Sequence, residues 1–361
     1  MATPQDTLWD LAPHSRGKHR ILRSYADAWL PIMTSTNPRV VVVDAFAGPG
    51  RYLGGEDGSP LILLKAFLEH SSRERMQAEV VYVFIEERQD RVDYLSTEIA
   101  KLVRPANVTV QIHHGTYQEL FGPLLSRLQQ PGRRPVPTFA FVDPFGYSDA
   151  PMDLTGQFLQ FQHCEVLIYM PLTAVAQHLS RTGQEVALNS LFGTDRWTEA
   201  IALQGNERLR FLHDLFRDQL RASGSTYVRS FEIRYGGAHG YHLFFGTNNL
   251  LGLARMKEAM WKVDGLTGQR YGDSTESGQL VLFQVEVDTA PLLAALKAHF
   301  GHRAFSIEDA WKYTLVETAY AASHLKTRTL APAERRGELE VTTVRQRSCS
   351  YPARTRLRFV V

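Results

Sequence analysis

Three carboxylates that could act on a ligand stand where predicted buried strands end. They are Asp44, Glu86 and Asp143. Each follows an apolar run of the kind that suits a strand buried on both faces of a parallel sheet. In open sheets of this kind, ligands bind in the crevice outside the carboxyl ends of the strands. We therefore expect all three side chains to lie at one crevice.

The glycine-containing segment DAFAGPG (44–50) directly follows the first of these strands. Gly48 and Gly50 let the backbone turn tightly and let a ligand approach it closely. In methyltransferases a carboxylate at this position commonly meets the cationic methionine end of S-adenosylmethionine. We therefore predict a site for this cofactor, formed by Asp44, Phe46, Ala47, Gly48 and Gly50. The alternative is a plain strand–turn–helix corner, because loose glycine motifs match often.

Glu86 is the candidate for holding the ribose of the cofactor, because an acid at this position typically accepts hydrogen bonds from ribose hydroxyls. The usual spacing from the glycine loop is about 20 residues. Here 42 residues separate Asp44 from Glu86, so the segment 51–60 is predicted to be an insertion. Glu87 is the competing candidate. Thr116, which follows the third predicted strand, is expected to border the adenine pocket.

The sequence Asp143-Pro144-Phe145-Gly146-Tyr147 indicates transfer to an amine. A base amine is a poor nucleophile, because its lone pair is delocalised into the ring. The Asp143 carboxylate and the Pro144 carbonyl can each accept one N–H bond and so orient the nitrogen. Phe145 or Tyr147 can stack on a base taken out of its helix. The motif is similar to that of tRNA guanine-N2 methyltransferases. The alternative is a strand-end turn.

The elements that position these residues alternate between strand and helix. The predicted strands are 39–45, 78–86, 108–113, 138–144 and 165–171. The predicted helices are 17–33, 61–70, 88–103, 117–129 and 152–161. This alternation indicates an α/β fold with a doubly wound sheet.

A hairpin is expected to end the sheet. Strands 226–234 and 241–247 follow a helical stretch, 174–222, and are joined by the turn GGAHG, whose glycines suit a tight hairpin loop. A parallel sheet with a terminal antiparallel hairpin is the usual sheet of Rossmann-like, class I methyltransferases. Nucleotide-binding dehydrogenases normally continue with parallel strands instead.

The C-terminal part of the chain is predicted to be a separate module. Helices are expected at 290–300, from the capping-box-like Ser306–Asp309 onward, and at 319–336. A hairpin of 339–345 with 355–361 would complete a winged helix-turn-helix. The predicted domains are therefore an N-terminal helical segment (1–37), a Rossmann-like domain (38–285) with a helical insertion (174–222), and a winged-helix-like module (286–361).

The last residues form a basic tail on a chain whose formal charge is only +2. Residues 341–361 contain five arginines and no acidic residue. Such a tail is typical of nucleic-acid contact, and we predict that Arg354, Arg356 and Arg358 bind phosphates. The alternative is a solvated pair of strands.

Composition excludes several classes of protein. An apolar fraction of 44% and a charged fraction of 22% are those of an ordinary globular protein. Cys164 and Cys349 are too few for a structural zinc site or a disulfide framework, so no metal is expected. No apolar signal region and no uncharged apolar run of roughly 18 residues is present, and we expect a cytoplasmic protein.

Lys18 and His19 stand at the start of the first predicted helix. A similar Lys-His pair precedes the core of ribosomal RNA adenine-N6 methyltransferases. Lys18 is therefore a candidate for contacting phosphate, and His19 for contacting the substrate or the cofactor. The alternative is an exposed helix start with no contact to either ligand.

Together these features resemble the three-Cys-motif partner proteins. The resemblance rests on Lys18-His19, DAFAGPG, FIE (84–86), FVDPFG (141–146), LFFGT (243–247) and GLARMKEAM (252–260). It covers roughly residues 15 to 265. It implies a methyltransferase-like fold and a partner protein that carries a three-cysteine motif and is similar to radical S-adenosylmethionine proteins.

The leading interpretation is an S-adenosylmethionine-dependent methyltransferase acting on an exocyclic amine of a nucleobase in DNA or RNA. One alternative is a catalytically silent subunit with the same fold that binds the three-cysteine protein. Another is a small-molecule methyltransferase, against which the basic tail counts. A nicotinamide enzyme is the weakest alternative, because nothing assigns Asp-Pro-Phe-Gly a role in hydride transfer.

Overall fold

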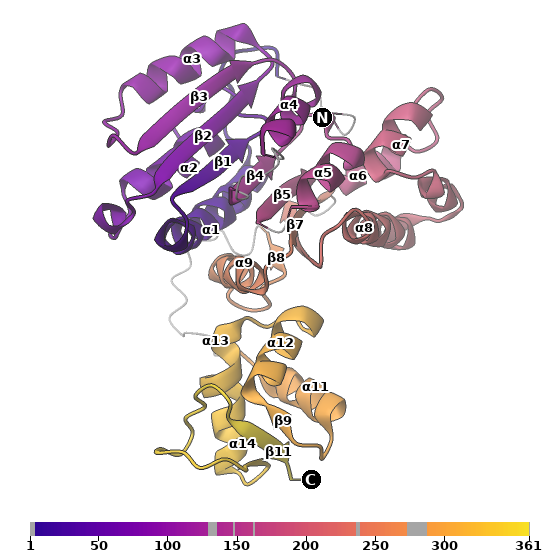
Figure 1. Ribbon diagram of the computed structural model, residues 1–361. Helices are drawn as coiled ribbons and strands as arrows, with labels where there is room; N and C mark the ends of the chain where they lie inside the picture. Colours follow the sequence, from indigo (N-terminus) through magenta and orange to yellow (C-terminus); the bar gives the residue numbers. More distant parts are fainter. Residues whose placement is uncertain are drawn as a thin grey trace.

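The computed structural model describes residues 4–128, 136–146, 149–161, 163–235, 239–272 and 287–360. Its largest element is an eight-stranded sheet with the strand order β3-β2-β1-β4-β5-β7-β6-β8 (Figure 1). The strands are β1 (Arg39–Asp44), β2 (Glu79–Glu86), β3 (Val108–His114), β4 (Thr138–Val142), β5 (Cys164–Met170), β6 (Tyr227–Tyr235), β7 (His239–Thr247) and β8 (Arg270–Tyr271).

The predicted parallel sheet with a terminal antiparallel hairpin is confirmed. Neighbours among β1 to β5 pair in parallel, whereas β7 runs antiparallel to both β5 and β6. The hairpin turn, residues 236–238, lies outside the described residues. The short strand β8, which pairs in parallel with β6, was not predicted.

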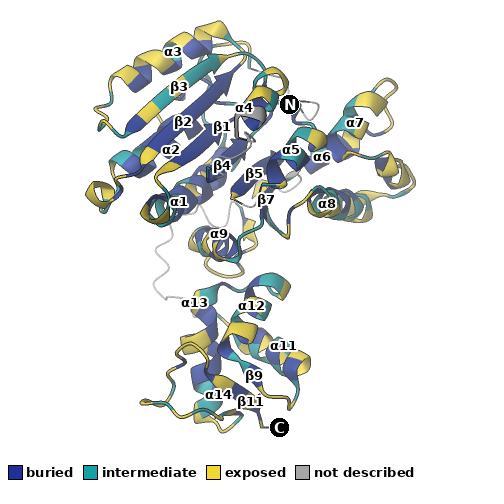
Figure 2. Cartoon of the chain, in the orientation of Figure 1, coloured by how far each residue is buried: buried dark blue, intermediate teal, exposed yellow. Residues whose placement is uncertain are grey.

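Helices cover both faces of the sheet (Figure 1). One face packs against α1 (Pro13–Thr36), α2 (Ser59–Leu68), α3 (Gln89–Ala100) and α9 (Leu250–Val263). The other face packs against α4 (Tyr117–Leu128), α5 (Met152–Leu159), α6 (Leu172–His178), α7 (Glu185–Phe192), the 3-10 helix η3 (Arg196–Ala202) and α8 (Gly205–Ala222). The central strands are therefore almost completely buried (Figure 2). Cys164 is buried.

Helix α1 begins earlier than the sequence pattern predicted. Pro13 occupies its first turn, where a missing N–H costs no hydrogen bond. Lys18 and His19 therefore lie inside the helix, and their exposed fractions are only 4% and 8%. An exposed helix start is thus the wrong description of this pair.

Residues 287–360, here called the C-terminal module, have a hydrophobic cluster of their own. Its elements are α11 (Ala290–Phe300), β9 (Phe305–Ser306), α12 (Ile307–Glu317), α13 (Ala322–His324), the π-helix η4 (Leu325–Leu330), α14 (Ala331–Arg335), β10 (Leu339–Val341) and β11 (Arg356–Phe359). The predicted helices, the capping box of Ser306 with Asp309 and the hairpin are present. Strand β9, which extends the hairpin to three strands, was not predicted.

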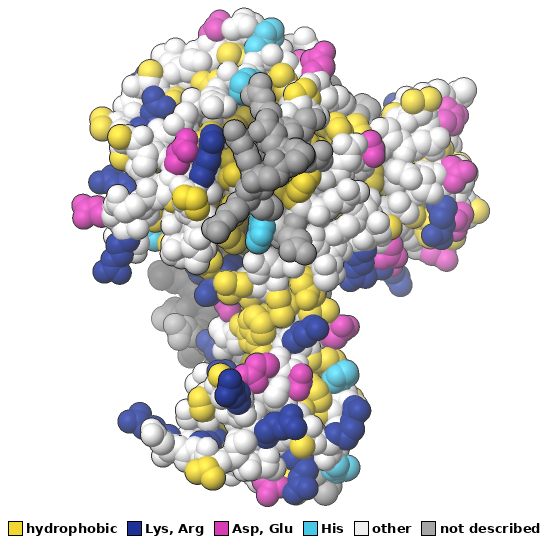
Figure 3. All heavy atoms as spheres, viewed as in Figure 1, with side chains coloured by type: hydrophobic (Ala, Val, Ile, Leu, Met, Phe, Trp, Pro, Cys, Tyr) yellow, Lys and Arg dark blue, Asp and Glu magenta, His cyan; other side chains and the backbone are white. Residues whose placement is uncertain are grey.

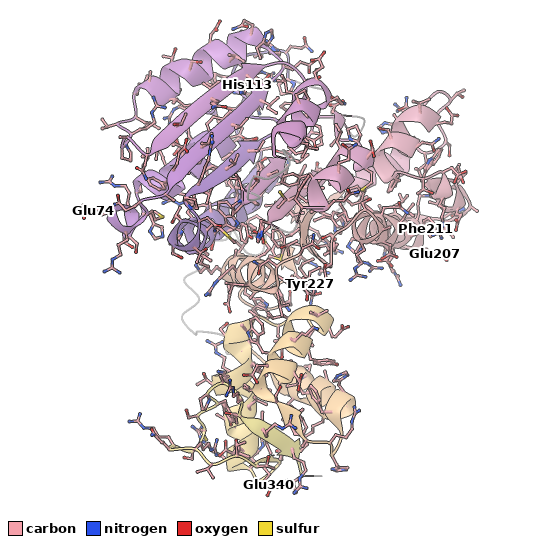
Figure 4. All side chains as sticks on the ribbon, in the orientation of Figure 1. Glu74, His113, Glu207, Phe211, Tyr227 and Glu340 are labelled. Atoms are coloured by element: carbon pink, nitrogen blue, oxygen red, sulfur yellow. The ribbon has the colours of Figure 1, made fainter. Side chains whose placement is uncertain are left out.

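Helix α9 joins the sheet to the C-terminal module. The Lys257 ammonium donates to the carbonyl oxygens of Thr314, Leu315 and Thr318, each at 2.9 Å. These carbonyls lie at the end of α12, where they lack partners within the helix. Burial lowers the pKa of Lys257 to about 6. Hydrophobic side chains gather at the same junction (Figure 3), and Tyr227 lies there as well (Figure 4).

No helix in the described part of the chain is long and apolar enough to cross a membrane.

Candidate functional site

The three carboxylates lie at one edge of the sheet, as predicted. Asp44 pairs in register with Phe84 on one side and with Phe141 on the other. Glu86 and Asp143 each stand two residues beyond those partners, so all three are near the carboxyl ends of adjacent strands. Two cavities open at this edge, with volumes of about 180 Å³ and about 260 Å³. The first is lined by the glycine loop and Asp143, and the second by Glu86 and Thr116.

The glycine loop has the backbone conformation that its glycines allow. Gly48 and Gly50 have φ values of 61° and 79°, which side-chain-bearing residues rarely adopt. A Cβ on Gly50 would lie 2.5 Å from the Cδ1 of Leu95. Phe46, Ala47, Gly48 and Gly50 all line the first cavity. The loop therefore presents its backbone to the space where a ligand fits.

Asp44 is completely buried beside this loop and does not itself line either cavity. Burial raises the pKa of Asp44 to about 7, and the nearby Asp143 carboxylate adds to the rise. Hydrogen bonding from the Ser59 side chain and the Phe46 amide opposes it. The Oδ2 atom of Asp44 is buried and lacks a hydrogen-bond partner within the described part of the chain. A buried acceptor of this kind has capacity for a further donor.

Glu86, and not Glu87, faces the glycine loop. Its Oε2 accepts a hydrogen bond from the Gly48 amide at 2.8 Å, and its Oε1 accepts one from the Arg88 amide at 2.9 Å. Burial raises the pKa of Glu86, while these amides and the Arg91 guanidinium oppose the rise. A carboxylate has about four acceptor sites, so Glu86 can still accept from a ligand. Glu87 is exposed.

Asp143 is joined to Lys18 by an ion pair between its Oδ2 and the Lys18 ammonium. The same ammonium lies 4.5 Å from the centre of the Tyr169 ring. The Lys18 side chain is 5% exposed and that of Asp143 is 21% exposed. Lys18 is therefore a buried partner of Asp143 and not a residue of the outer surface.

Three of the remaining predicted residues line the cavities. Pro144 lines the first cavity, Thr116 lines the second, and Phe145 lines both. His19 is buried and its ring packs 5.7 Å from that of Tyr52. Burial lowers the pKa of His19 to about 3. Tyr147 lies outside the described residues.

Several aromatic residues that line the first cavity were not predicted from the sequence. Trp9, His14, Tyr52 and Tyr169 all line it. The rings of His14 and Tyr241 stack at 4.5 Å, and burial lowers the pKa of His14 to about 4. Trp9 precedes any recognisable helix or strand pattern, so no periodicity singled it out. Tyr169 resembled an ordinary residue of a buried strand.

The tail arginines lie far along the chain from these cavities, and no residue of the C-terminal module lines either of them in the described structure. Along β11 the side chains alternate, because Arg356 and Arg358 are exposed while Leu357 and Phe359 are buried. Arg358 forms an ion pair with Glu340 at 2.7 Å. Among the described residues, no group of His, Cys, Asp and Glu could hold a metal ion.

Comparisons with solved structures give distant likenesses. No family model and no curated protein matches the chain. The O-methyltransferase TomG from Streptomyces achromogenes, solved with SAM, is 15% identical over 64% of this chain and 79% of that one, with a TM-score of 0.34. Trm1 from Pyrococcus horikoshii, solved with S-adenosyl-L-methionine, is 13% identical over 73% and 62%, with a TM-score of 0.37. The delta-N METTL16 MTase domain is 11% identical over 63% and 83%, with a TM-score of 0.33. Likenesses this distant carry no conclusion about activity or substrate.

Proposed function

We propose that the chain is an S-adenosylmethionine-dependent methyltransferase that acts on an exocyclic amine of a nucleobase in DNA or RNA. One observation carries the proposal: Asp143 and Pro144 line the same cavity as the glycine loop. A group that orients an amine is thereby placed beside a loop suited to a nucleotide-like cofactor. The sheet, parallel with a terminal antiparallel hairpin, is the one expected of class I methyltransferases.

The residues at this edge fit the cofactor. The orphaned Oδ2 of Asp44 offers an acceptor near the loop, where the methionine ammonium is expected. Glu86 has acceptor sites left for the ribose hydroxyls, and Thr116 borders the second cavity, where adenine is expected. When bound, S-adenosylmethionine supplies a methyl group activated by its sulfonium. The chain's own residues would hold this molecule through Asp44, the backbone of residues 46–50, and Glu86.

The acceptor amine would be oriented by Asp143 and Pro144. Lys18 already binds one oxygen of the Asp143 carboxylate, which leaves Oδ1 for an N–H of the amine. The Pro144 carbonyl would accept the second N–H, and Phe145 would stack on the base. These fixed acceptors stabilise the charge that develops on nitrogen, which is catalysis by orientation and electrostatics.

The C-terminal module supports a nucleic-acid substrate. Its order of three helices, a hairpin and the added strand β9 is consistent with a winged helix-turn-helix. Residues 287–360 carry twelve Lys and Arg residues against seven Asp and Glu residues. We infer that this module binds phosphates through Arg354, Arg356 and Arg358, and that the chain works with a three-cysteine-motif partner in the cytoplasm.

The ion pair of Lys18 with Asp143 also favours a second candidate, a catalytically silent binding subunit. An ammonium that stayed on the carboxylate would compete with an acceptor amine for it. Both candidates require the same methyltransferase-type fold, but only the first predicts that a methyl group is transferred. Mass spectrometry of nucleosides from RNA and DNA incubated with the protein and S-adenosylmethionine separates them.

Calorimetry with S-adenosylmethionine and its demethylated product tests the cofactor assignment. We expect saturable heat from the wild type and none from Gly48→Val. Valine would be strained at the positive φ of this position, and its side chain would enter the surface that the ligand contacts. No heat from a folded wild-type sample with either ligand would refute the assignment.

A further inference from the structure

The N-terminal segment, defined here as residues 4–12, crosses the edge of the sheet that carries both cavities. The carbonyl of Pro4 accepts hydrogen bonds from Arg91 at 2.6 Å and from Arg88 at 3.0 Å, both at the start of α3. The Thr7 hydroxyl donates to Asp90 at 2.5 Å. At the other end, the carbonyl of Trp9 accepts from the amide of Leu53 at 2.9 Å. The segment is thus fixed at two points, one on each side of the crevice.

The indole of Trp9 lies between these two points. Its ring centre is 5.8 Å from that of Phe145 and 5.8 Å from that of Tyr52, both edge to face. The Arg91 guanidinium lies 4.7 Å from the Trp9 ring and 5.5 Å from the Phe145 ring. Arg91 is only 1% exposed, so this cation is held against aromatic faces inside the protein.

Trp9, Arg91 and Phe145 together divide the crevice. Trp9 lines only the first cavity and Arg91 only the second, whereas Phe46 and Phe145 line both. Pockets that enclose molecules of this size usually measure about 300 Å³ or more. The cavities of about 180 Å³ and about 260 Å³ are each smaller than that. A cofactor with its methionine end at the glycine loop and its adenine beside Thr116 must occupy both.

We propose that the N-terminal segment is a gate over the cofactor crevice, which must swing away from Phe145 and α3 for S-adenosylmethionine to enter and for its product to leave. This inference rests on the proposed cofactor. The segment contains no helix or strand. Hydrogen bonds with Arg88, Arg91, Asp90 and Leu53 hold it at the crevice, together with the ring contacts of Trp9. Opening therefore breaks no regular structure. The rate of cofactor exchange would then be set by the release of Trp9.

A reversible cross-link tests this gate. Thr7→Cys with Asp90→Cys, in a Cys349→Ser background, places two thiols at the outer hydrogen bond of the segment, and a short cleavable bismaleimide can bridge them. We expect bridging to slow both association and dissociation of S-adenosylhomocysteine by about tenfold or more, and ligand loaded before bridging to stay bound through gel filtration. Cleavage of the bridge should restore the rates. The single variant Thr7→Cys, treated identically, is the control.

A second pair of variants addresses Trp9 itself. Trp9→Ala should speed dissociation by about tenfold, because the aromatic and cation–π contacts are lost, and Trp9→Phe should restore much of the difference. If the wild-type protein binds S-adenosylhomocysteine but bridging and Trp9→Ala leave its association and dissociation rates unchanged, the gate is overturned. The proposed cofactor is then unaffected. Wild-type protein that binds no S-adenosylhomocysteine would overturn the proposed cofactor and, with it, the gate.

Discussion

The Lys18 ammonium on α1 forms an ion pair with the Asp143 carboxylate at the end of β4, across 125 residues of sequence. Helix α1 thus provides a wall of the proposed acceptor site. The contact of Lys18 with phosphate stays a prediction, and the ion pair gives this ammonium a partner within the chain. It holds the carboxylate that would meet the acceptor amine, and it is itself held over the Tyr169 ring.

Lys18→Met should destabilise the protein. It leaves the Asp143 carboxylate without its partner in a largely enclosed site. Loss of one partner of a fully buried pair costs about 3–5 kcal/mol. Because Asp143 is 21% exposed, we expect about 2 kcal/mol in urea unfolding.

The double variant Lys18→Met/Asp143→Asn should be less destabilised than the two single variants added together. Arg23→Met is a matched control, because it removes exposed ion pairs with Asp27 and Glu69 and should cost less than about 1 kcal/mol. Equal stabilities of Lys18→Met and the wild type would contradict the importance of the pair.

Cofactor binding should strengthen as pH rises through 7. Asp44 has its pKa raised to about 7, so it is mostly neutral at pH 6 and mostly ionised above pH 7. If the cationic end of the ligand requires the ionised form, affinity should increase about eightfold between pH 6 and pH 7.5. His14 and His19, with pKa values lowered to about 4 and about 3, stay neutral in this range.

Calorimetry at both pH values measures this change, and Asp44→Asn should bind weakly with no pH dependence. Because the pKa of Asp44 is raised, this carboxyl stays protonated in the folded state between about pH 4 and pH 7. In the unfolded state it has already lost that proton in the same range. The contribution of Asp44 to stability therefore falls as pH rises across that window. A wild-type affinity that is flat from pH 6 to 7.5 would rule out a role for the ionised carboxylate.

Replacing Arg354, Arg356 and Arg358 with Ala should weaken binding of all nucleic-acid sequences about equally. Phosphate contacts release counterions, so the salt dependence of affinity should also become flatter. Arg358 should contribute least, since it is paired with Glu340. Fluorescence anisotropy at several salt concentrations measures both effects. Full nucleic-acid affinity combined with failure to capture the three-cysteine partner would identify the tail as a protein-docking surface.

Lys257→Met should loosen the C-terminal module from the sheet domain. Lys257 is 1% exposed, and its ammonium donates to three carbonyls at the end of α12. Methionine fills similar space but leaves those acceptors unsatisfied, which costs about 1–3 kcal/mol. Small-angle scattering and limited proteolysis measure the loosening. Lys262→Met, on the exposed side of the same helix, is the control. Identical scattering from both variants would argue against this role.

The sheet could be predicted from the sequence, because strands buried on both faces leave an unmistakable apolar pattern. RVVVVDA and FVDPFG also placed Asp44 and Asp143 at strand ends. Contacts across the crevice could not be predicted in this way. The pairing of Lys18 with Asp143 and the contact of Trp9 with Phe145 join segments over 120 residues apart, and neither has a periodic signal. Strands β8 and β9 are only two residues long, too short to show a pattern.

The most direct test of the central claim is methyl transfer from labelled S-adenosylmethionine to RNA or DNA by wild type and by Asp143→Ala, with cofactor affinity measured on the same samples. Loss of one preorganised acceptor should raise the barrier by about 3 kcal/mol, a reduction in rate of about 100-fold. Cofactor affinity should be nearly unchanged, because Asp143 is assigned to the acceptor. If the wild-type protein binds the cofactor and methylates, and Asp143→Ala methylates at the same rate, then Asp143 does not orient the acceptor amine and the central claim is wrong.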